Sequence, residues 1–403
     1  MKALAEGMVG KSSKHVLLHL VGGSNPRSGM MSYVRQLVRE DLPGFQQRVW
    51  KYRGYAAENE SYLRLGRART TDVNLPADLA AALLDFVPLY RWLRSNPTAV
   101  LYAHSRAGSI LTALIRQVRQ VPVITHLHVN WRRTAFHRFL WRVARSTVIF
   151  NSSRTCRHFG QAVETAHIHM PTIRWPKRPE PGEGRLVACS AIQPIKNIHL
   201  IIEAFNAAAD AAPRTLHIYG VSPEPFDAGY QQRIIKLAKQ NPRICLYDWD
   251  ECWSDHLGYN DVFIHASRLE SFGIVMLEAF AKGCRMVVPH DTFLNDLSQE
   301  GVFCADLTTE SLAKAVRLAN SYGSPSGLWE ARRTFEKQFD IETTRQQLCA
   351  LLCPSVGPKP RFSFDRCLKN SGQKSHNTSN HNGLTAKNAK DTKSNQTGAN
   401  SLD

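Results

Sequence analysis

A buried strand that leads directly into a helix is the feature that most constrains the fold of this chain. Residues 261–266 are largely apolar without polar alternation, as in a parallel strand that is covered on both faces. Residues 271–273 (Ser-Phe-Gly) predict a tight turn. Residues 274–282 then have helical periodicity up to Gly283, and glycine suits the end of a helix. A strand, a turn and a helix in this order predict an open α/β sheet with parallel strands.

Two glutamates flank the predicted turn. Glu270 follows the strand, at the carboxyl edge where ligands bind in open α/β sheets, and Glu278 lies within the helix. The backbone N–H groups of residues 271–274 open the helix and favour oxygen-rich or anionic ligands. The residues alone leave a second interpretation open, in which Glu270 caps the helix and Glu278 is a solvated surface charge.

The same strand–loop–helix pattern occurs on both sides of a proline-rich stretch. A strand at residues 15–21, a glycine-containing loop and a helix from Met30 form the first unit of a Rossmann-like domain, without the Gly-x-Gly-x-x-Gly pattern that indicates NAD. Residues 170–184 hold four prolines and two glycines and predict a linker, and a new α/β pattern starts at Arg185. The expected organisation is a first Rossmann-like domain (1–172), a linker (173–184), a second Rossmann-like domain (185–335), a cross-over helix (336–353) and a disordered polar tail (354–403).

The charge of the chain is uneven and restricts its partners. Residues 1–180 contain 27 basic and 10 acidic residues, whereas the remainder is balanced, so the whole net charge of +17 lies in the first half. This imbalance favours an anionic partner such as a lipid surface or a phosphorylated substrate. The nine cysteines are scattered without a Cys-x-x-Cys pair, which indicates reduced thiols in a cytoplasmic protein rather than a disulfide or zinc framework.

One segment of the first half resembles a membrane-surface helix. Residues 130–145 carry five arginines, bulky aromatic residues and no acid. We expect this segment to place the protein peripherally on the inner face of the plasma membrane, since no 18-residue apolar span and no signal peptide are found. An ordinary helix with a solvated basic face is the alternative, and nucleic-acid binding is disfavoured because no recognised module accompanies the basic residues. The expected membrane-contacting residues are Arg132, Arg133, Arg138, Trp141 and Arg142.

The region around Glu270 resembles a known family signature. The sequence Ser-Arg-Leu-Glu-Ser-Phe-Gly, the second acid Glu278 and the Ala-x-x-x-Gly that ends at Gly283 are similar to the Glu-x7-Glu signature of retaining GT-B glycosyltransferases, especially glycosyltransferase family 4. Residues 191–205, which contain Lys196, resemble the segment of that family that contacts the donor diphosphate. The resemblance implies a GT-B fold, in which two Rossmann-like domains face a cleft and a C-terminal helix crosses back to the first domain.

The resemblance assigns roles to individual residues. Glu278 is expected to accept hydrogen bonds from the donor ribose and Glu270 to hold a sugar hydroxyl, while Lys196 neutralises charge on the leaving diphosphate. His128 matches a histidine near the sugar and the acceptor, although a structural role explains a lone histidine equally well, and we expect His126 to point to the opposite strand face. The implied catalytic residues are His128, Glu270 and Lys196, and the implied donor-binding residues are Gly29, Lys196, Gly220, Ser271, Phe272, Gly273, Ile274 and Glu278.

One position departs from the family pattern. Ala191 stands where the family usually has an arginine, and an arginine–phosphate pair supplies two charge-assisted hydrogen bonds. Its loss is expected to weaken donor binding by about 1.5–3 kcal/mol per bond, unless Arg27 or Arg268 takes its place.

The resemblance implies retaining transfer of a hexose-type sugar from a UDP- or GDP-sugar to a hydroxyl acceptor, in surface polysaccharide or glycolipid biosynthesis. The expected partners are the nucleotide sugar, a lipid-linked or saccharide acceptor and an anionic membrane surface, with no nucleic acid. No metal or other cofactor is expected, because lysine and the helix N-terminus supply the positive charge. A second hypothesis is a catalytically silent GT-B protein that acts as a binding or membrane-docking subunit, which Ala191 and the short loop at Gly220 favour.

Overall fold

The structure is a computed structural model of the 403-residue chain. It describes residues 15–21, 29–50, 62–63, 75–128, 133–162, 166–168, 173, 175, 179–225, 227–250, 252–290, 292, 294, 300–323 and 325–352. The predicted tail (354–403) lies outside the described residues, as do residues 174 and 176–178 of the predicted linker (173–184).

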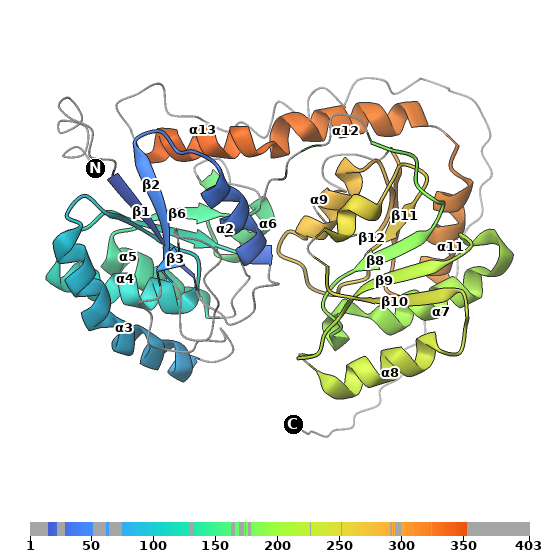
Figure 1. Ribbon diagram of the computed structural model, residues 1–403, viewed down its shortest axis with the longest axis horizontal. Helices are drawn as coiled ribbons and strands as arrows, with labels where there is room; N and C mark the ends of the chain where they lie inside the picture. The colour runs from blue at the N-terminus through green and yellow to red at the C-terminus, as the bar shows by residue number, and fades with distance from the viewer. Residues whose placement is uncertain are drawn as a thin grey trace, which may run out of the picture. The chain divides into compact units, whose positions relative to one another are not determined.

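Two parallel sheets form the framework (Figure 1). The first has the order β3-β2-β1-β4-β5-β6-β7 and the second the order β10-β9-β8-β11-β12-β13, with every recorded pairing of strands parallel. The strands of the first sheet are β1 (His15–Leu20), β2 (Phe45–Trp50), β3 (Tyr62–Leu63), β4 (Val100–Ala103), β5 (Val123–Leu127), β6 (Thr147–Phe150) and β7 (His167–Ile168). Those of the second are β8 (Leu186–Cys189), β9 (Leu216–Val221), β10 (Ile244–Asp248), β11 (Val262–Ile264), β12 (Arg285–Pro289) and β13 (Val302–Ala305). The predicted pair of parallel α/β domains is therefore confirmed.

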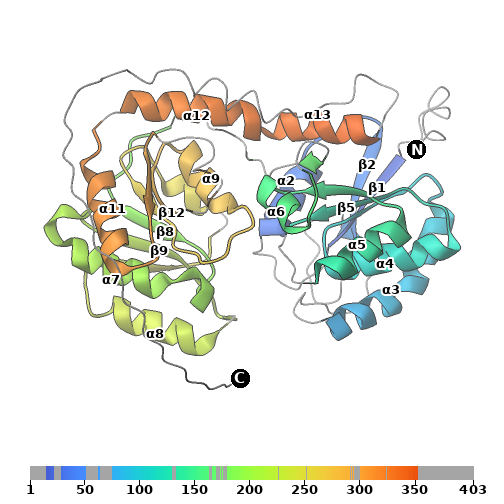
Figure 2. The same cartoon turned by 180° about the vertical axis from the view of Figure 1, so that it is seen from behind.

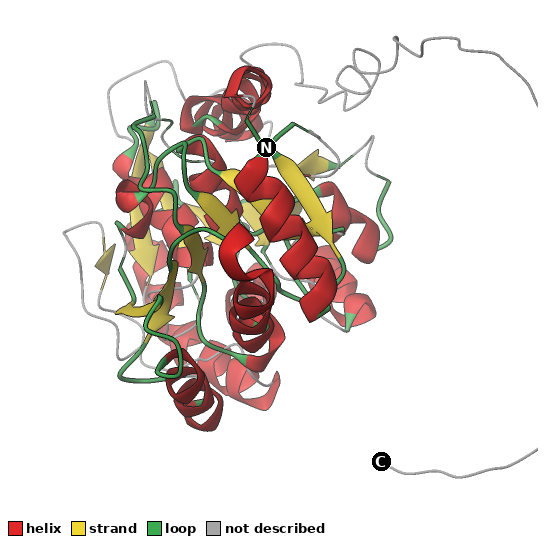
Figure 3. Ribbon diagram, turned by 90° about the vertical axis from the view of Figure 1, so that its right-hand side faces the viewer, coloured by secondary structure: helices red, strands yellow, loops and turns green. Residues whose placement is uncertain are grey.

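Helices cover both faces of the first sheet, because its central strands are apolar on both sides (Figures 2 and 3). Helices α3 (Leu75–Ser95), α4 (Arg106–Val118) and α5 (Thr134–Ala144) share one core with one sheet face, to which Leu18, Leu89 and Leu111 belong. Helix α2 (Gly29–Arg39) packs on the opposite face, and α6 (Ser153–His158) follows β6.

The second sheet is covered in the same way. Helices α7 (Ile198–Ala208), α8 (Ala228–Ala238) and α11 (Thr309–Ser321) share a core with one face of the sheet. Helix α9 (Ile274–Ala281) follows β11 and contacts α12 (Pro325–Phe339), where the rings of Phe280 and Phe335 lie 4.7 Å apart. The short 3-10 helices η2 (Pro194–Lys196) and η4 (Trp253–His256) precede α7 and β11.

The predicted cross-over helix (336–353) consists of two helices. Helix α12 ends at Phe339 and α13 (Ile341–Leu352) returns to the first domain, where Leu348 and Leu352 join the core under α2 (Figure 1). The break at Asp340 has two causes. Asp340 pairs with Ile173 in an isolated bridge, and its side chain accepts a hydrogen bond from the backbone N–H of Glu342, which starts a new helix.

Gly220 allows β9 to pass close to the end of β8. Its φ is +140°, and a Cβ at this position would overlap the backbone carbonyl oxygen of Ser190. We expect Gly220→Ala to lower the free energy of unfolding by about 1–3 kcal/mol or more. Chemical unfolding followed by circular dichroism measures this change. Gly323→Ala is the matched control, since a Cβ there has no neighbour within 4 Å, and an equal effect of both variants would contradict this reading.

Candidate active site

A cavity of about 500 Å³ is lined by residues of both domains. The first domain contributes residues along the whole length of α2 and the segments that follow β5 and β6. The second domain contributes the segments after β8, β10 and β11 together with the start of α9. The carboxyl ends of parallel strands therefore supply most of the wall, as the general rule for ligand sites in open α/β sheets requires.

Glu270 and Lys196 form an ion pair in the wall of this cavity. Lys196 Nζ lies 2.6 Å from Glu270 Oε2, and the two side chains are only 22% and 18% exposed. His265 Nε2 lies 3.4 Å from the same oxygen. Burial alone would raise the pKa of Glu270, but His265 and Lys196 outweigh it and hold the pKa at about 2. Glu270 is therefore a carboxylate at neutral pH.

A strained turn brings Lys196 to Glu270. Lys196 ends η2, and Asn197 follows in the left-handed region with a φ of 52°, which asparagine tolerates better than most residues. The Asn197 side chain donates a 2.9 Å hydrogen bond to the carbonyl oxygen of Ala266, just beyond β11. The loop that carries the lysine is thus attached to the strand that leads to the glutamate.

Gly273 closes the turn between Glu270 and α9. It has a φ of +88°, and a Cβ there would overlap the Met276 side chain and lie 3.0 Å from Glu270 Cγ. Residues 271–275 line the cavity, so the first turn of α9 opens toward it. The start of this helix can therefore supply backbone donors to an anion, as the sequence predicts.

Glu278 lies on α9 and also lines the cavity. The indole Nε1 of Trp253 donates a 3.0 Å hydrogen bond to Glu278 Oε2. Burial raises the pKa of Glu278 to about 7, although the Trp253 donor opposes the shift. The two glutamates therefore differ in charge state. Glu270 is ionised, whereas Glu278 titrates near neutral pH and can gain negative charge when a ligand supplies further donors.

His128 follows β5, is 7% exposed and lines the cavity from the first domain. The expectation that His126 points away from it is wrong, because the two rings lie only 4.0 Å apart. Residues two apart on a strand share a face, and the first residue after β5 continues that alternation.

The predicted glycines have different surroundings. Gly29 begins α2 and lines the cavity, where a Cβ would lie 3.7 Å from Ile274 Cγ2 of the second domain. Gly220 is not among the described residues that line the cavity, and its conformation is explained by the close approach to Ser190.

The cationic residues near Ala191 also differ from expectation. Ala191 lines the cavity, whereas Arg268 lies in the wall of a separate depression beside α7 and α8. Arg27 lies outside the described residues. Arg35 and Arg39 of α2 line the cavity instead, at positions that carry no sequence signal of their own.

The predicted membrane contacts on α5 need a correction. Trp141 is 7% exposed and packs against Phe150 and Phe159, so its ring is not available to a lipid headgroup layer. Arg133 and Arg142 are exposed, Arg138 is half-buried and Arg132 lies outside the described residues. The amphipathic pattern identified the helix, but Trp141 lies on its buried side, whereas Phe139 is 59% exposed.

Three features of the site were not identified from the sequence. His265 and Trp253 contact the two glutamates but belong to no motif by themselves. An Asp-x-Asp pair lies at the end of β10, where Asp248 is the last residue of the strand and Asp250 follows it. Of these three residues only Trp249, between the two aspartates, lines the cavity. Asp250 instead accepts a hydrogen bond from the backbone N–H of Cys252.

The fold and the second domain match known proteins. Residues 170–325 match the model of the family described as "Glycosyl transferases group 1". Comparison with curated proteins gave no match. The structure is similar to Anabaena HepE in complex with UDP and glucose, with a TM-score of 0.64, 16% identity, and coverage of 84% of this chain and 99% of that chain.

Two further solved structures are similar to the same extent. Sucrose-phosphate synthase from Thermosynechococcus elongatus has a TM-score of 0.65 at 14% identity, with coverage of 84% of this chain and 98% of that chain. A glycosyltransferase from Rickettsia africae has a TM-score of 0.64 at 11% identity, with coverage of 86% and 100%. The fold is GT-B, and residues 170–325 are similar to the family of group 1 glycosyl transferases.

The Lys196–Glu270 pair gives a pH-dependent stability that can be measured. The pKa of Glu270 is about 2 in the folded protein against an ordinary value of 4.5, so its contribution is present above pH 4.5 and is lost as the pH falls toward 2. The contribution amounts to about 3 kcal/mol at most. We expect Glu270→Gln to flatten the acid limb of the unfolding free energy measured by urea titration, whereas Glu224→Gln on the exposed surface leaves it unchanged. An unaltered acid limb in Glu270→Gln would contradict the ion pair.

Proposed function

We propose that this protein transfers a hexose-type sugar from a UDP- or GDP-sugar to a hydroxyl acceptor with retention of anomeric configuration. The observation that carries the proposal is the partly buried Lys196–Glu270 pair beside the first turn of α9. It combines a cation for a leaving diphosphate with a carboxylate that can accept hydrogen bonds from sugar hydroxyls. HepE, which has the same fold, was solved with UDP and glucose, and this supports a UDP-linked donor.

Each cavity residue has a distinct role in this proposal. Lys196 exchanges part of its interaction with Glu270 for the donor phosphates, and the backbone N–H groups at the start of α9 add to its charge. Glu270 binds a hydroxyl of the transferred sugar, and Glu278 binds the ribose. His128 contacts the sugar or the acceptor from the first domain. Lysine and the helix N-terminus make a metal ion unnecessary for the leaving group.

A donor panel tests the reaction. We expect the protein to release UDP or GDP from one nucleotide sugar in a coupled assay, and an added hydroxyl acceptor to receive the sugar in the original anomeric configuration by NMR. Glu278→Ala lowers kcat/KM for that donor by about tenfold or more. No turnover of any donor, with the variant no different from wild type, would instead support the silent binding subunit.

The pKa of Glu278 predicts how donor binding depends on pH. The ionised carboxylate is the better acceptor for ribose hydroxyls, and the pKa of Glu278 is about 7 in the ligand-free protein. UDP affinity should therefore rise as the pH increases through 7 and level off above it. Calorimetric titration of UDP across this range checks the slope. Glu278→Gln is the control, because the UDP phosphates still titrate whereas the side chain at position 278 no longer does. An identical slope of affinity against pH in both proteins would show that Glu278 does not cause the pH dependence.

We also propose that the protein docks on an anionic lipid surface through α3 and its neighbours rather than through Trp141. Four large apolar side chains of α3, Leu79, Leu83, Leu84 and Val87, are each at least 45% exposed. Arg91 and Arg94 are exposed toward the end of the same helix. An exposed apolar row followed by arginines is typical of a helix that lies in the interface of a bilayer. None of the described helices is both long and apolar enough to cross a membrane.

The charges around α3 favour a lipid over a protein partner. Between residues 86 and 163 the sequence contains twelve arginines and no lysine, aspartate or glutamate. The two acids of α3 are fully buried, where Asp78 pairs with Arg106 and Asp85 accepts a hydrogen bond from Trp50. The layer of α3, α4 and α5 therefore exposes no carboxylate, and lipid phosphates meet only arginines. A lipid-linked acceptor at the membrane suits such an enzyme.

Vesicle binding tests this surface. We expect the protein to co-sediment with phosphatidylglycerol-containing vesicles and the double variant Leu83→Ser/Leu84→Ser to bind about tenfold more weakly. Added salt should weaken binding of wild type, since the arginine contribution is screened. Leu318→Ser on α11, which replaces an equally exposed leucine of the second domain, is the control. Unchanged binding of the double variant would exclude α3 as the docking surface.

A further inference from the structure

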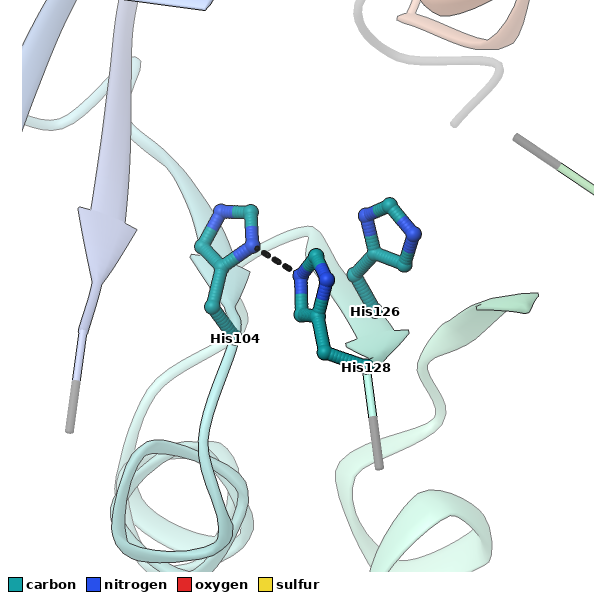
Figure 4. A group of neighbouring side chains, drawn as sticks. All are labelled: His104, His126 and His128. Atoms are coloured by element: carbon teal, nitrogen blue, oxygen red, sulfur yellow. Dashed lines mark hydrogen bonds between the residues drawn. The ribbon is translucent and has the colours of Figure 1, made fainter. Parts of the chain in front are cut away.

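A chain of hydrogen bonds connects four neighbouring strands of the first sheet and ends at the cavity. His19 of β1 contacts Gln47 of β2 through Nε2 at 3.1 Å and His104, just after β4, through Nδ1 at 3.0 Å. His104 Nδ1 in turn contacts His128 Nε2 at 3.0 Å, as Figure 4 shows. All four side chains are at least nine-tenths buried, and His128 alone among them lines the cavity.

The far end of the chain has a fixed polarity. The amide nitrogen of Gln47 donates two hydrogen bonds of 2.8 Å, to the backbone carbonyl oxygens of Leu37 and Glu40. A rotated amide would place its oxygen against both carbonyls and leave no donor for either. The oxygen of Gln47 must therefore face His19, and His19 Nε2 must carry the proton that this oxygen accepts.

This polarity passes from one ring to the next because each histidine is neutral. Burial lowers the pKa of His19 to about 4 and that of His128 to about 3, and it also lowers the pKa of His104. A neutral imidazole has one donor and one acceptor nitrogen. With its proton on Nε2, His19 accepts through Nδ1 from His104 Nε2–H, and His104 accepts through Nδ1 from His128 Nε2–H.

We propose that Gln47, His19 and His104 are positioning residues that hold the His128 proton on Nε2, so that His128 offers an unprotonated Nδ1 to a hydroxyl of the bound sugar or acceptor. No described residue hydrogen-bonds to His128 Nδ1. The role toward a sugar rests on the proposed function, whereas the fixed tautomer rests on the hydrogen bonds alone. The hydrogen bonds across the sheet thus make His128 Nδ1 a hydrogen-bond acceptor. The neutral His128 ring can then orient a ligand hydroxyl that donates to it.

A metal site is the rival explanation for these rings. Nitrogen atoms of His104, His126 and His128 lie within 4.8 Å of one another, which is close enough to suggest three ligands. Both nitrogens of His104 are already used, by His19 and His128, and His126 Nδ1 lies 3.0 Å from the Tyr102 hydroxyl. A zinc ion needs nitrogen lone pairs that converge on it, whereas the lone pair of His104 Nδ1 is directed at a neighbouring donor.

Histidine ¹⁵N NMR tests the tautomer directly in the full-length protein. We expect His128 to show an unprotonated Nδ1 and a protonated Nε2, both unchanged between about pH 6 and 8. Gln47→Met removes the fixed acceptor, and the two His128 shifts should then move toward each other as both tautomers become populated. Thr112→Val, which removes a buried hydrogen bond of α4 outside the chain, is the control and should leave them unchanged.

Three results would overturn the proposal. A protonated Nδ1 in the wild type contradicts the tautomer, and unchanged shifts in Gln47→Met contradict the positioning role. Added zinc that shifts the signals of His104, His126 and His128 together, at one ion per protein molecule, would show that the three histidines form a metal site and not a chain of hydrogen bonds.

Activity separates this proposal from the proposed function. Gln47→Met should lower kcat/KM for the sugar donor about twofold or more, because only the His128 tautomer with an unprotonated Nδ1 is competent, and leave UDP affinity unchanged because UDP lacks the transferred sugar. An equal loss of UDP affinity would mean a general structural defect and would count against the positioning role. Absence of turnover in wild type would refute the glycosyltransferase reaction, while the NMR result still decides the tautomer.

Discussion

The ion pair between Lys196 and Glu270 is the interaction on which the site depends. Two opposite charges in a cavity wall are stable when their attraction offsets the loss of hydration. Here the 2.6 Å contact with Lys196, together with His265, keeps Glu270 ionised despite its burial. The fold supplies this contact by joining the loop before α7 to the segment after β11 through Asn197. In the proposed reaction a donor diphosphate meets a lysine that is already positioned, so little reorganisation is needed when it binds.

The remaining cavity residues follow from the parallel order of the strands. Glu270 follows β11, His128 follows β5, and both sheets present their carboxyl ends to one cavity. The Ser152 hydroxyl donates a 2.9 Å hydrogen bond to the carbonyl oxygen of Ser271, so the first domain contacts the turn before α9 directly. Lys196 and Glu270 of the second domain and His128 of the first thereby line one cavity, although they are far apart in the sequence.

Much of this arrangement could be predicted from the sequence, because local patterns carried it. The apolar strand before Glu270, the glycine at 273 and the helical run up to Gly283 are all short-range signals, and they predicted the α/β fold and the positions of Glu270 and Glu278 around the turn. The orientation of Trp141 could not be predicted, since an arginine-rich amphipathic helix with aromatic residues fits either a lipid surface or a protein core.

Long-range contacts account for what the sequence did not reveal. The exposed row on α3 is recognised only once Asp78 and Asp85 are known to be buried against Arg106 and Trp50. The histidine chain is equally hidden, because Gln47 and His104 are separated by 57 positions and meet through His19 on the strand between them. Single histidines after strands are common, and only their shared hydrogen bonds distinguish this group.

The most direct test of the account is the affinity of UDP and GDP for the wild-type protein and for Lys196→Met, measured by calorimetry. The account predicts that one nucleoside diphosphate binds with one site per chain and that Lys196→Met weakens it by about 10- to 100-fold. Lys236→Met on the exposed side of α8 should bind it as wild type does. Absence of binding by either nucleotide, or equal affinity in the wild type and Lys196→Met, would contradict the assignment of this cavity to a nucleotide sugar.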